Sequence, residues 1–358
     1  MKICLLGDFT GTPDEGMKNI SQTTYAFLSM KNEVKKVNTR DVTKLTVLMQ
    51  LRKFRPDIVH YLHGPTIRSL IILKIIRLIL HQNVKIIVSA TRPFFSKFSQ
   101  EFISFFKPDL ILTQSEKFEN FFKKHGCRVR FFPNAVDCRL FTPVDSYSKK
   151  YFRKKYNLPY NKKIVLHVGH LKQNRKLKTF LKIQSLKGFQ VVVVGGTGEK
   201  TDEFLKNTLK RAGIIVIHEF IKNISEIYRA SDLYLFPISD AKEQLPESYN
   251  EIGAIDLPLS VLEAMACNLP VVTTPFGALP RLFKQGNGFE YAQSENDMIQ
   301  KVKALINISN VNTRDKVRPY DLLTIINNLQ LQYAELINNG NHVESKIHTG
   351  FKCKEMIR

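Results

Sequence analysis

The sequence predicts an α/β protein built from two domains. Its 358 residues exceed the length of one ordinary domain, and 43% of them are apolar, which is typical of a globular chain. Short apolar runs alternate with segments in which apolar residues recur at helical spacing, as in parallel sheets covered by helices. No run of about 18 uncharged apolar residues occurs, so we expect no membrane-spanning helix.

Each half is expected to contain its own set of parallel strands. In the first half, where a turn-rich loop and a helix fill residues 7–30, strands are expected at residues 3–6, 33–38, 58–61, 84–89 and 110–113. In the second half they are expected at residues 164–168, 191–194, 214–217, 233–236 and 271–273. A basic connection over residues 145–163 joins the halves, and a last helix spans residues 319–337. Ligands bind at the carboxyl ends of such strands, so a site is expected in the loops that follow them.

The chain is strongly basic. Its formal net charge is +22, and residues 146–188 contain thirteen Lys or Arg and no Asp or Glu. Such a balance favours anionic partners, namely a lipid surface, a phosphate-bearing substrate or nucleic acid, although a merely solvated basic surface is an equal alternative. No nucleic-acid recognition motif is present, so a nucleic-acid partner is not expected.

The cysteines and the first residues indicate the cellular compartment of the protein. The five cysteines are scattered and lack metal-site spacing, which favours a reducing cytosol. The apolar part of residues 1–8 is too short for a signal peptide and is expected to form a strand. We therefore expect a cytoplasmic protein, with the inner face of the membrane as a second location.

The segment from Asp256 to Thr274 is the most informative part of the chain. Pro258 suits the first turn of a helix, apolar residues recur at helical spacing over residues 259–265, and residues 269–274 read as a buried strand. The start of a helix beside an open sheet favours phosphate, and Glu263 lies within reach of hydroxyls on the same ligand. Taken alone, the segment is also compatible with an amphipathic helix that binds nothing.

This segment resembles the donor-binding signature of retaining GT-B glycosyltransferases of family 4, in which a second Glu precedes Ala-Met-Ala-Cys-Gly. Here Glu263 precedes Ala264-Met-Ala-Cys267. Further segments match the family in order along nearly the whole chain: Glu15-Gly-Met-Lys18, Pro56-Asp-Ile-Val-His60, Pro133-Asn-Ala-Val-Asp137, Val168-Gly-His-Leu171 and Ala230-Ser-Asp-Leu-Tyr-Leu-Phe-Pro237. Together they make a fortuitous match improbable.

The resemblance implies a GT-B fold, in which two Rossmann-like, doubly wound domains face a central cleft. Residues 1–145 would bind the acceptor and residues 146–318 the nucleotide sugar. Residues 319–338 would form a helix that crosses back to the first domain, and residues 339–358 a polar, basic tail.

The resemblance also implies the reaction. A sugar would move from a UDP- or GDP-sugar to a glycan or lipid-linked acceptor with retention of anomeric configuration. In that mechanism the donor phosphate helps to deprotonate the acceptor, and no metal or cofactor besides the nucleotide-sugar co-substrate takes part. The chain agrees in having no Asp-x-Asp carboxylate pair after a strand.

Site residues follow from the same resemblance. The donor would be bound by Gly16, His170, Arg175, Gly196, Ile221, Leu259, Ser260 and Glu263. Arg175 can give a forked pair of hydrogen bonds to phosphate, and Glu263 would bind the ribose hydroxyls. Arg175 and Asp256 are the candidate catalytic residues.

The chain departs from the family at three places. Ile255 stands where the family has its first Glu, which contacts the donor sugar, and His170 stands where it has Arg. Asp256 is the best placed substitute, ahead of Glu247 and Glu251, but it is equally well explained as a helix cap. Residues 90–93 lack the acceptor-side His of many members, and His63 is the nearest histidine. Ile255 and His170, in place of the two expected polar groups, motivate the second hypothesis, a non-catalytic GT-B-like nucleotide-sugar binding protein.

Aromatic and basic residues raise the question of a membrane. Phe94, Phe98, Phe102 and Phe105, with Phe95 and Phe106, recur at helical spacing among lysines, and residues 69–80 and 118–122 form similar stripes. Helices of this kind can lie in a bilayer interface. Core packing is the favoured interpretation of each stripe singly, but the net charge supports a peripheral enzyme on an anionic membrane surface.

Overall fold

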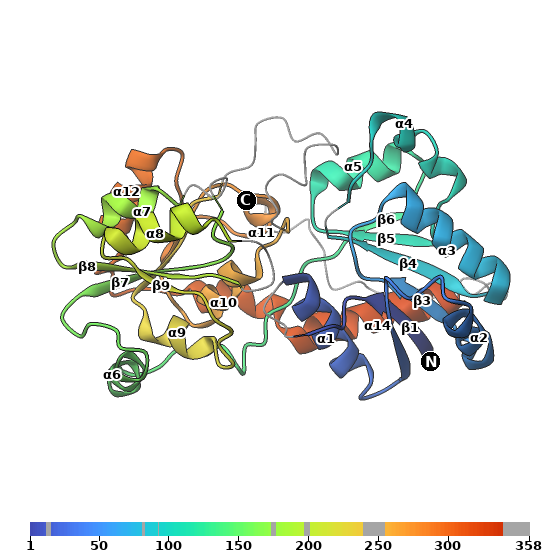
Figure 1. The fold of residues 1–358 in the computed structure, drawn as a ribbon, viewed down its shortest axis with the longest axis horizontal. Helices are drawn as coiled ribbons and strands as arrows, with labels where there is room; N and C mark the ends of the chain where they lie inside the picture. The colour runs from blue at the N-terminus through green and yellow to red at the C-terminus, as the bar shows by residue number, and fades with distance from the viewer. Residues whose placement is uncertain are drawn as a thin grey trace.

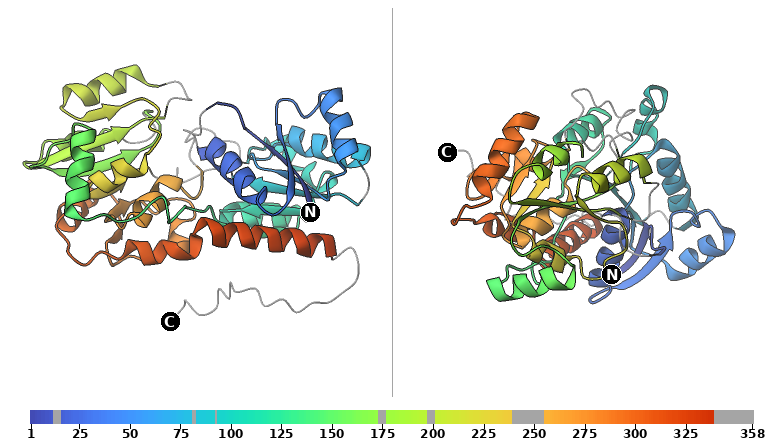
Figure 2. Two further views of the ribbon diagram at one scale, coloured as in Figure 1. Left: turned by 90° about the horizontal axis from the view of Figure 1, so that it is seen from below. Right: turned by 60° about the vertical axis from the view of Figure 1, so that its left-hand side comes forward.

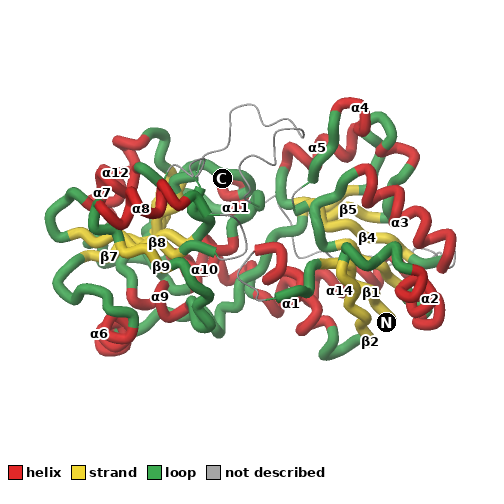
Figure 3. The backbone as a smooth tube through the Cα atoms, viewed as in Figure 1, coloured by secondary structure: helices red, strands yellow, loops and turns green. Residues whose placement is uncertain are grey.

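The structure is a computed structural model of the chain that describes residues 1–11, 16–80, 83–91, 93–172, 177–196, 201–238 and 255–338. These residues form two lobes that lie side by side (Figure 1). Each lobe is an α/β domain around a parallel sheet, which is six-stranded in the described part of the chain. Figure 3 shows the two sheets, each flanked by helices.

The first sheet has the strand order β2-β1-β3-β4-β5-β6. Its strands are β1 Lys2–Gly7, β2 Glu33–Asn38, β3 Ile58–Tyr61, β4 Lys85–Ala90, β5 Leu110–Thr113 and β6 Val129–Phe131. The five expected strands are confirmed to within one residue at each end. The edge strand β6 was not expected, because its three residues are only partly buried and Arg130 interrupts the apolar run.

Helices cover both faces of this sheet. The first helix, α1 Gly16–Leu28, and the last, α14 Leu322–Asn338, pack on the face that Ile3 and Leu5 present. On the opposite face, which Cys4 and Leu6 present, lie α2 Leu45–Phe54, α3 Ile67–Leu80, α4 Lys97–Gln100 and α5 Glu116–Lys124. Successive side chains of β1 point to opposite faces of the sheet, and they therefore contribute to the cores under both helix layers.

The phenylalanines of residues 94–106 do not form one amphipathic helix. The short helix α4 and a 3₁₀ turn, η1 Ile103–Phe105, divide the segment. Phe95 is buried, whereas Phe98 and Phe105 are 78% and 69% exposed. Core packing is therefore the wrong interpretation for most of this stripe, and it is confirmed for the stripe in α5, where Phe118 and Phe122 are buried.

The second sheet has the order β12-β11-β10-β7-β8-β9. Its strands are β7 Lys163–Val168, β8 Phe189–Val194, β9 Ile215–Ile217, β10 Leu233–Phe236, β11 Val271–Thr273 and β12 Phe289–Tyr291. The five expected strands are again confirmed, and the edge strand β12 was not expected. One face carries α7 Thr179–Gln184, α8 Glu203–Arg211 and α12 Glu295–Leu305, and the other carries α9 Ser225–Ala230, α10 Leu259–Ala266 and α13 Thr313–Val317. The short α11 Leu279–Leu282 follows β11.

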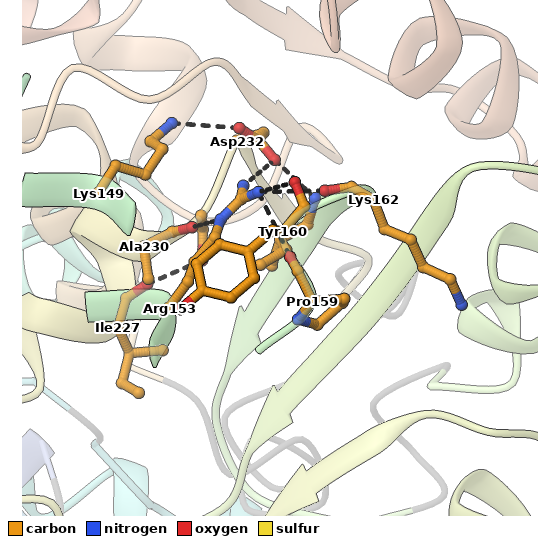
Figure 4. A network of polar contacts seen from close by, with 10 residues as sticks. Lys149, Arg153, Pro159, Tyr160, Lys162, Ile227, Ala230 and Asp232 are labelled. Carbon is orange, nitrogen blue, oxygen red and sulfur yellow. Dashed lines mark hydrogen bonds and ion pairs between the residues drawn. The ribbon is translucent and has the colours of Figure 1, made fainter. Parts of the chain in front are cut away.

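The basic stretch after residue 145, which the sequence predicts to connect the domains, contains a helix. Residues Ser146–Lys155 form α6, and the Asp145 side chain caps it by accepting from the Ser148 N–H at 2.7 Å. Arg153 of α6 is buried and donates to the Ala230 carbonyl at 3.0 Å and to Asp232 at 2.5 Å. Figure 4 shows that the same guanidinium also donates to the backbone carbonyls of Pro159, Tyr160 and Lys162. The helix is thus anchored in the second domain by a buried ion pair.

The chain passes between the domains twice, and the two passages run together. Val136, on the outward passage, donates its N–H to the Tyr320 carbonyl at 3.1 Å and accepts from the Leu322 N–H at 3.0 Å. The return passage then enters α14, which runs along the first domain (Figure 2, left). The expected helix at residues 319–337 begins later, at Leu322, because residues 318–320 form a separate 3₁₀ turn that contains Pro319.

Candidate functional site

Loops at the carboxyl ends of the second sheet meet around Gly195. Gly169, after β7, donates its N–H to the Val194 carbonyl at 2.9 Å, and Gly195, after β8, donates to the Ile217 carbonyl at 2.8 Å. A Cβ on Gly195 would lie 2.9 Å from Leu171 Cδ1 and 3.2 Å from His218 Cδ2. Only a glycine allows these loops to pack so closely. His170 and Gly196, which flank this contact, are therefore held at the same edge of the sheet.

The residue at the N-terminal cap of α10 is Pro258. It is in an extended conformation and makes no side-chain capping hydrogen bond. Asp256, the cap that the sequence offered as an alternative, lies two residues before this position and is not the N-cap residue. The amide groups of the first turn, at Leu259 and Ser260, are available to an anion.

Asp256 belongs to a loop that is held by contacts with residues 277 and 278. It is buried, and its backbone carbonyl accepts from the Ala278 N–H at 2.8 Å. Gly277 adopts φ = 53°, and a Cβ there would lie 2.0 Å from the Asp256 carbonyl oxygen. This glycine thus lets residues 277–278 press against the loop that leads into α10.

Glu263 lies one turn into α10, and Tyr228 of α9 holds it. The Tyr228 hydroxyl donates to Glu263 Oε2 at 2.7 Å. Burial raises the pKa of the Glu263 carboxyl to about 7, although the hydrogen bond from Tyr228 opposes the rise. Burial and the Glu263 charge together raise the pKa of Tyr228 well above its usual value, so this hydroxyl acts as a donor.

The two domains touch at the entrance of α10. A Cβ on Gly16, the first residue of α1, would lie 3.6 Å from Ile255 Cδ1 and 3.9 Å from Leu259 Cδ1. The structure thus brings together Gly16 and Leu259 with Ile255, the residue at which the chain departs from the family pattern.

A polar network fastens the same loop to the first domain. Asn134 donates to the Leu257 carbonyl at 2.8 Å, Leu257 donates its N–H to Gln114 Oε1 at 3.3 Å, and the Gln114 and Asn134 side chains bond each other. Both side chains also line a cavity of about 80 Å³, together with His60 of β3 and residues of α1 and α14; Leu259 of α10 is its lining residue from the second domain. His60 contacts the Tyr333 hydroxyl at 2.6 Å, and its burial lowers its pKa to about 3, so it is a neutral packing residue.

On the first domain, Asp8 and His63 occupy neighbouring strand ends. Burial raises the pKa of Asp8, but hydrogen bonds from Thr10 and the charges of Lys18 and His63 outweigh it and leave the pKa below its ordinary value. Burial lowers the pKa of His63, and Asp8 partly offsets this. His63 is therefore electrostatically coupled to a carboxylate at the edge that faces the second domain, rather than isolated in the core.

The structure places the described candidate site residues on α1, on α10 and in the loops at the strand ends of the second sheet. Leu259, Ser260 and Glu263 share α10, Gly16 meets its first turn, and His170 and Gly196 lie at neighbouring strand ends. Ile221 packs against the core that α9 and α10 share. Arg175, Glu247 and Glu251 lie outside the described residues.

Sequence reasoning missed Tyr228 and Gln114. An aromatic residue in a short helix reads as a core residue, and Tyr228 is indeed fully buried, so nothing in the sequence indicated that its hydroxyl holds Glu263. Gln114 does follow a strand directly, and that position at a carboxyl end was a usable signal.

The second domain matches a known family. Residues 162–307 match the family model described as Glycosyl transferases group 1. The D-inositol 3-phosphate glycosyltransferase of Corynebacterium jeikeium is 27% identical over 169 residues, which are 43% of this chain and 37% of that relative. The protein of the same name from Mycobacteroides abscessus is 28% identical over 155 residues, 41% of this chain and 31% of that relative. The chain thus spans about a third of the length of these curated relatives.

Solved structures resemble nearly the whole chain. HepE from Anabaena in complex with UDP and glucose superposes with a TM-score of 0.71 at 16% identity, over 94% of this chain and 100% of that chain. Sucrose-phosphate synthase from Thermosynechococcus elongatus superposes with a TM-score of 0.71 at 14% identity, over 94% and 99% of the two chains. The predicted GT-B fold with two Rossmann-like domains is thereby confirmed. The narrower assignment to family 4 stays a prediction.

Proposed function

We propose that the protein is a retaining glycosyltransferase of the family 4 type, which moves a sugar from a nucleotide-sugar donor to a hydroxyl of a glycan or lipid-linked acceptor. The match of residues 162–307 to the group 1 family model carries this proposal, because that span contains the whole strand-end site of the second domain. HepE, one of the similar structures, is known in complex with UDP and with UDP-glucose. A UDP-sugar is therefore the first donor to test, and a GDP-sugar the second.

In this proposal the donor lies across the carboxyl edge of the second sheet. The diphosphate meets the uncapped amides of Leu259 and Ser260, and the ribose hydroxyls donate to Glu263. The base lies along residues 218–224 near Ile221. Arg175 and His170 neutralise the diphosphate, Gly16 and Gly196 let backbone approach it, and Asp256 contacts the sugar.

The reaction requires positioning and charge stabilisation more than a strong base. The bond between the anomeric carbon and the diphosphate oxygen breaks, and a bond to the acceptor oxygen forms on the same face of the sugar. The acceptor proton passes to the departing phosphate oxygen, and the nucleoside diphosphate is the leaving group. We propose that no metal ion takes part, so that turnover persists in excess EDTA.

Calorimetric titration tests the donor site. Purified protein is titrated with UDP, GDP and ADP and with the matching nucleotide sugars, alongside the Arg175→Ala and Glu263→Ala variants. Each change should weaken binding of the preferred donor by about 1.5–3 kcal/mol, the value of a charge-assisted hydrogen bond. Arg211→Ala, an exposed arginine at the end of α8, is the matched control and should bind normally. Unchanged binding in both site variants would contradict the placement of the donor.

The alternative is a non-catalytic nucleotide-sugar binding protein. It is favoured by one observation, namely that Ile255 presents an apolar side chain beside Gly16 where the family pattern has a carboxylate. Donor binding without transfer to any hydroxyl and without hydrolysis would favour this alternative. Turnover of any nucleotide sugar, with retention seen by NMR of the product, would exclude it.

A further inference from the structure

The outer helices of the first domain leave several large apolar side chains exposed. Leu45 and Met49 of α2 are 71% and 56% exposed, and Ile75 and Leu78 of α3 are 48% and 72% exposed. Phe98 and Phe105, from the segment after β4, complete the group. We call these six residues the outer face.

The six residues belong to one layer. α2, α3 and the segment 94–107 all cover the same side of the first sheet, and their inward residues share one core cluster. α2 packs directly on α3. α3 and the segment meet at a crevice lined by Leu73, Lys74 and Phe106. In Figure 1, α2 and α3 lie on the outer side of the right-hand lobe, away from the second domain, and α4 lies at the top of the same lobe.

The outer face is set in a strongly basic surface. Residues 44–55, 67–80 and 94–107 contain nine Lys or Arg and a single acidic residue, Glu101. Of these, Arg77 is paired with Asp109 and Lys44 with Asp41. Lys74, Lys97 and Lys107 are exposed among the apolar residues.

We propose that the outer face docks onto an anionic lipid bilayer, with the phenylalanines at the boundary of headgroups and acyl chains and the lysines on headgroup phosphates. Aromatic and aliphatic side chains among lysines are the composition that binds such an interface. The rings of Phe98 and Phe102 lie 5.2 Å apart and contact each other at the surface instead of entering the core. None of the helices in the described ranges is long and apolar enough to cross a membrane, so the contact would be peripheral.

Charge favours lipid over a second copy of the chain. If two copies of the chain paired through the outer face about a two-fold axis, the basic residues of one copy would lie against the basic residues of the other. Anionic headgroups neutralise that charge, whereas a second copy doubles it. This proposal does not depend on the proposed transferase activity.

Sedimentation with vesicles tests the docking. The full chain is mixed at low salt with vesicles of phosphatidylcholine alone or of phosphatidylcholine with phosphatidylglycerol. We expect it to sediment with the anionic vesicles, and binding to fall about ten-fold or more in F98S/F105S, because the buried apolar area is lost. K97Q/K107Q should also weaken binding, and high salt should do the same in the unaltered chain.

Phe204→Ser is the matched control, since Phe204 is 73% exposed on α8 of the second domain. It should leave vesicle binding unchanged, and unchanged melting temperatures should show that all variants fold. The proposal is overturned if the chain does not sediment with anionic vesicles, or if F98S/F105S and F204S bind alike. It is also overturned if light scattering shows a dimer that F98S/F105S dissociates while lipid binding persists.

Discussion

The Tyr228 hydroxyl donates to Glu263 Oε2 at 2.7 Å and so ties α9 to the second turn of α10. The bond fixes the orientation of a carboxylate whose burial raises its pKa to about 7. The rings of Phe141 and Tyr234 pack on Tyr228 at centroid distances of 5.6 and 5.8 Å and fix the tyrosine in turn. A residue of the proposed donor site is therefore positioned from within the core of the second domain.

Donor binding should depend on pH near neutrality. Ribose hydroxyls donate better to a carboxylate than to a carboxylic acid, so affinity for the nucleotide sugar should rise as pH increases through about 7 and fall about ten-fold per unit well below it. Calorimetry with a nucleotide sugar, whose diphosphate has no proton that titrates near pH 7, measures this. Glu263→Gln should remove the dependence, and an unaltered profile in that variant would contradict the assignment.

The same carboxyl should make stability depend on pH in the opposite sense. Its pKa in the folded chain lies above the ordinary 4.5, so the folded state binds the proton more tightly than the unfolded state does. The free energy of unfolding should therefore fall as pH rises from about 4.5 to about 7, and Glu263→Gln should flatten that part of the curve. Urea unfolding at several pH values is the measurement.

Tyr228→Phe should weaken donor binding by about ten-fold, because a hydrogen bond to a charged group contributes roughly 1.5–3 kcal/mol. Without the donor hydroxyl the pKa of Glu263 should rise further, so the midpoint of the binding profile should move to higher pH. Tyr291→Phe removes another hydrogen-bonded tyrosine hydroxyl in the second domain, one that donates to the Phe283 carbonyl at 2.9 Å, and serves as the control. Equal binding profiles for the two variants would show that Tyr228 acts only through packing.

Gly277→Ala should be far more damaging than an ordinary glycine substitution. The methyl group would combine the strain of φ = 53° with a 2.0 Å approach to the Asp256 carbonyl oxygen. Gly188→Ala is the matched comparison, because that glycine also has a positive φ but no atom within 4 Å of the added Cβ. We expect Gly277→Ala to cost about 2 kcal/mol more than Gly188→Ala in thermal unfolding, since only the first must move backbone. Similar losses of stability in both variants would show that the loop before α10 can move at little cost in free energy.

Asp232→Ala should destabilise the second domain by about 3–5 kcal/mol, because it leaves the buried Arg153 without its counter-ion. Burial raises the pKa of Asp232, but Lys149, the Ile164 N–H and Arg153 lower it more, so the pKa lies below 3.8. The stability from this pair should be present above pH 3.8 and be lost as pH falls through the folded-state pKa. Asp315→Ala breaks an exposed pair with Arg318 and should cost less than about 1 kcal/mol.

The sequence predicted the central strands because each is a short apolar run buried on both faces. It missed β6 and β12, which are three-residue strands at the edges of the sheets. The basic stretch before β7 looked like a connection because its charges outnumber its apolar residues. It folds as α6, which is held in place because Arg153 pairs with Asp232, a residue 79 positions away in the sequence.

The site could be predicted in part. The order Pro258, Leu259, Glu263 indicates a helix start and a carboxylate within the sequence itself. The contacts of Tyr228 with Glu263 and of Gln114 with Leu257 join residues that lie 35 and 143 positions apart. Local pattern does not encode such pairs, so they emerge only from the packing of α9, α10 and the first domain.

The position of α14 has a consequence for folding during synthesis. Tyr333 and Leu329 of this helix are buried against the sheet that Ile3 and Leu5 help to build. A ribosome releases residues 163–317 before it releases α14. The second domain can therefore pack its core while one face of the first sheet is still without the helix that covers it. The domain that is made first is thus the domain that is completed last. Until residue 338 has emerged, the growing chain must keep that apolar face from aggregating.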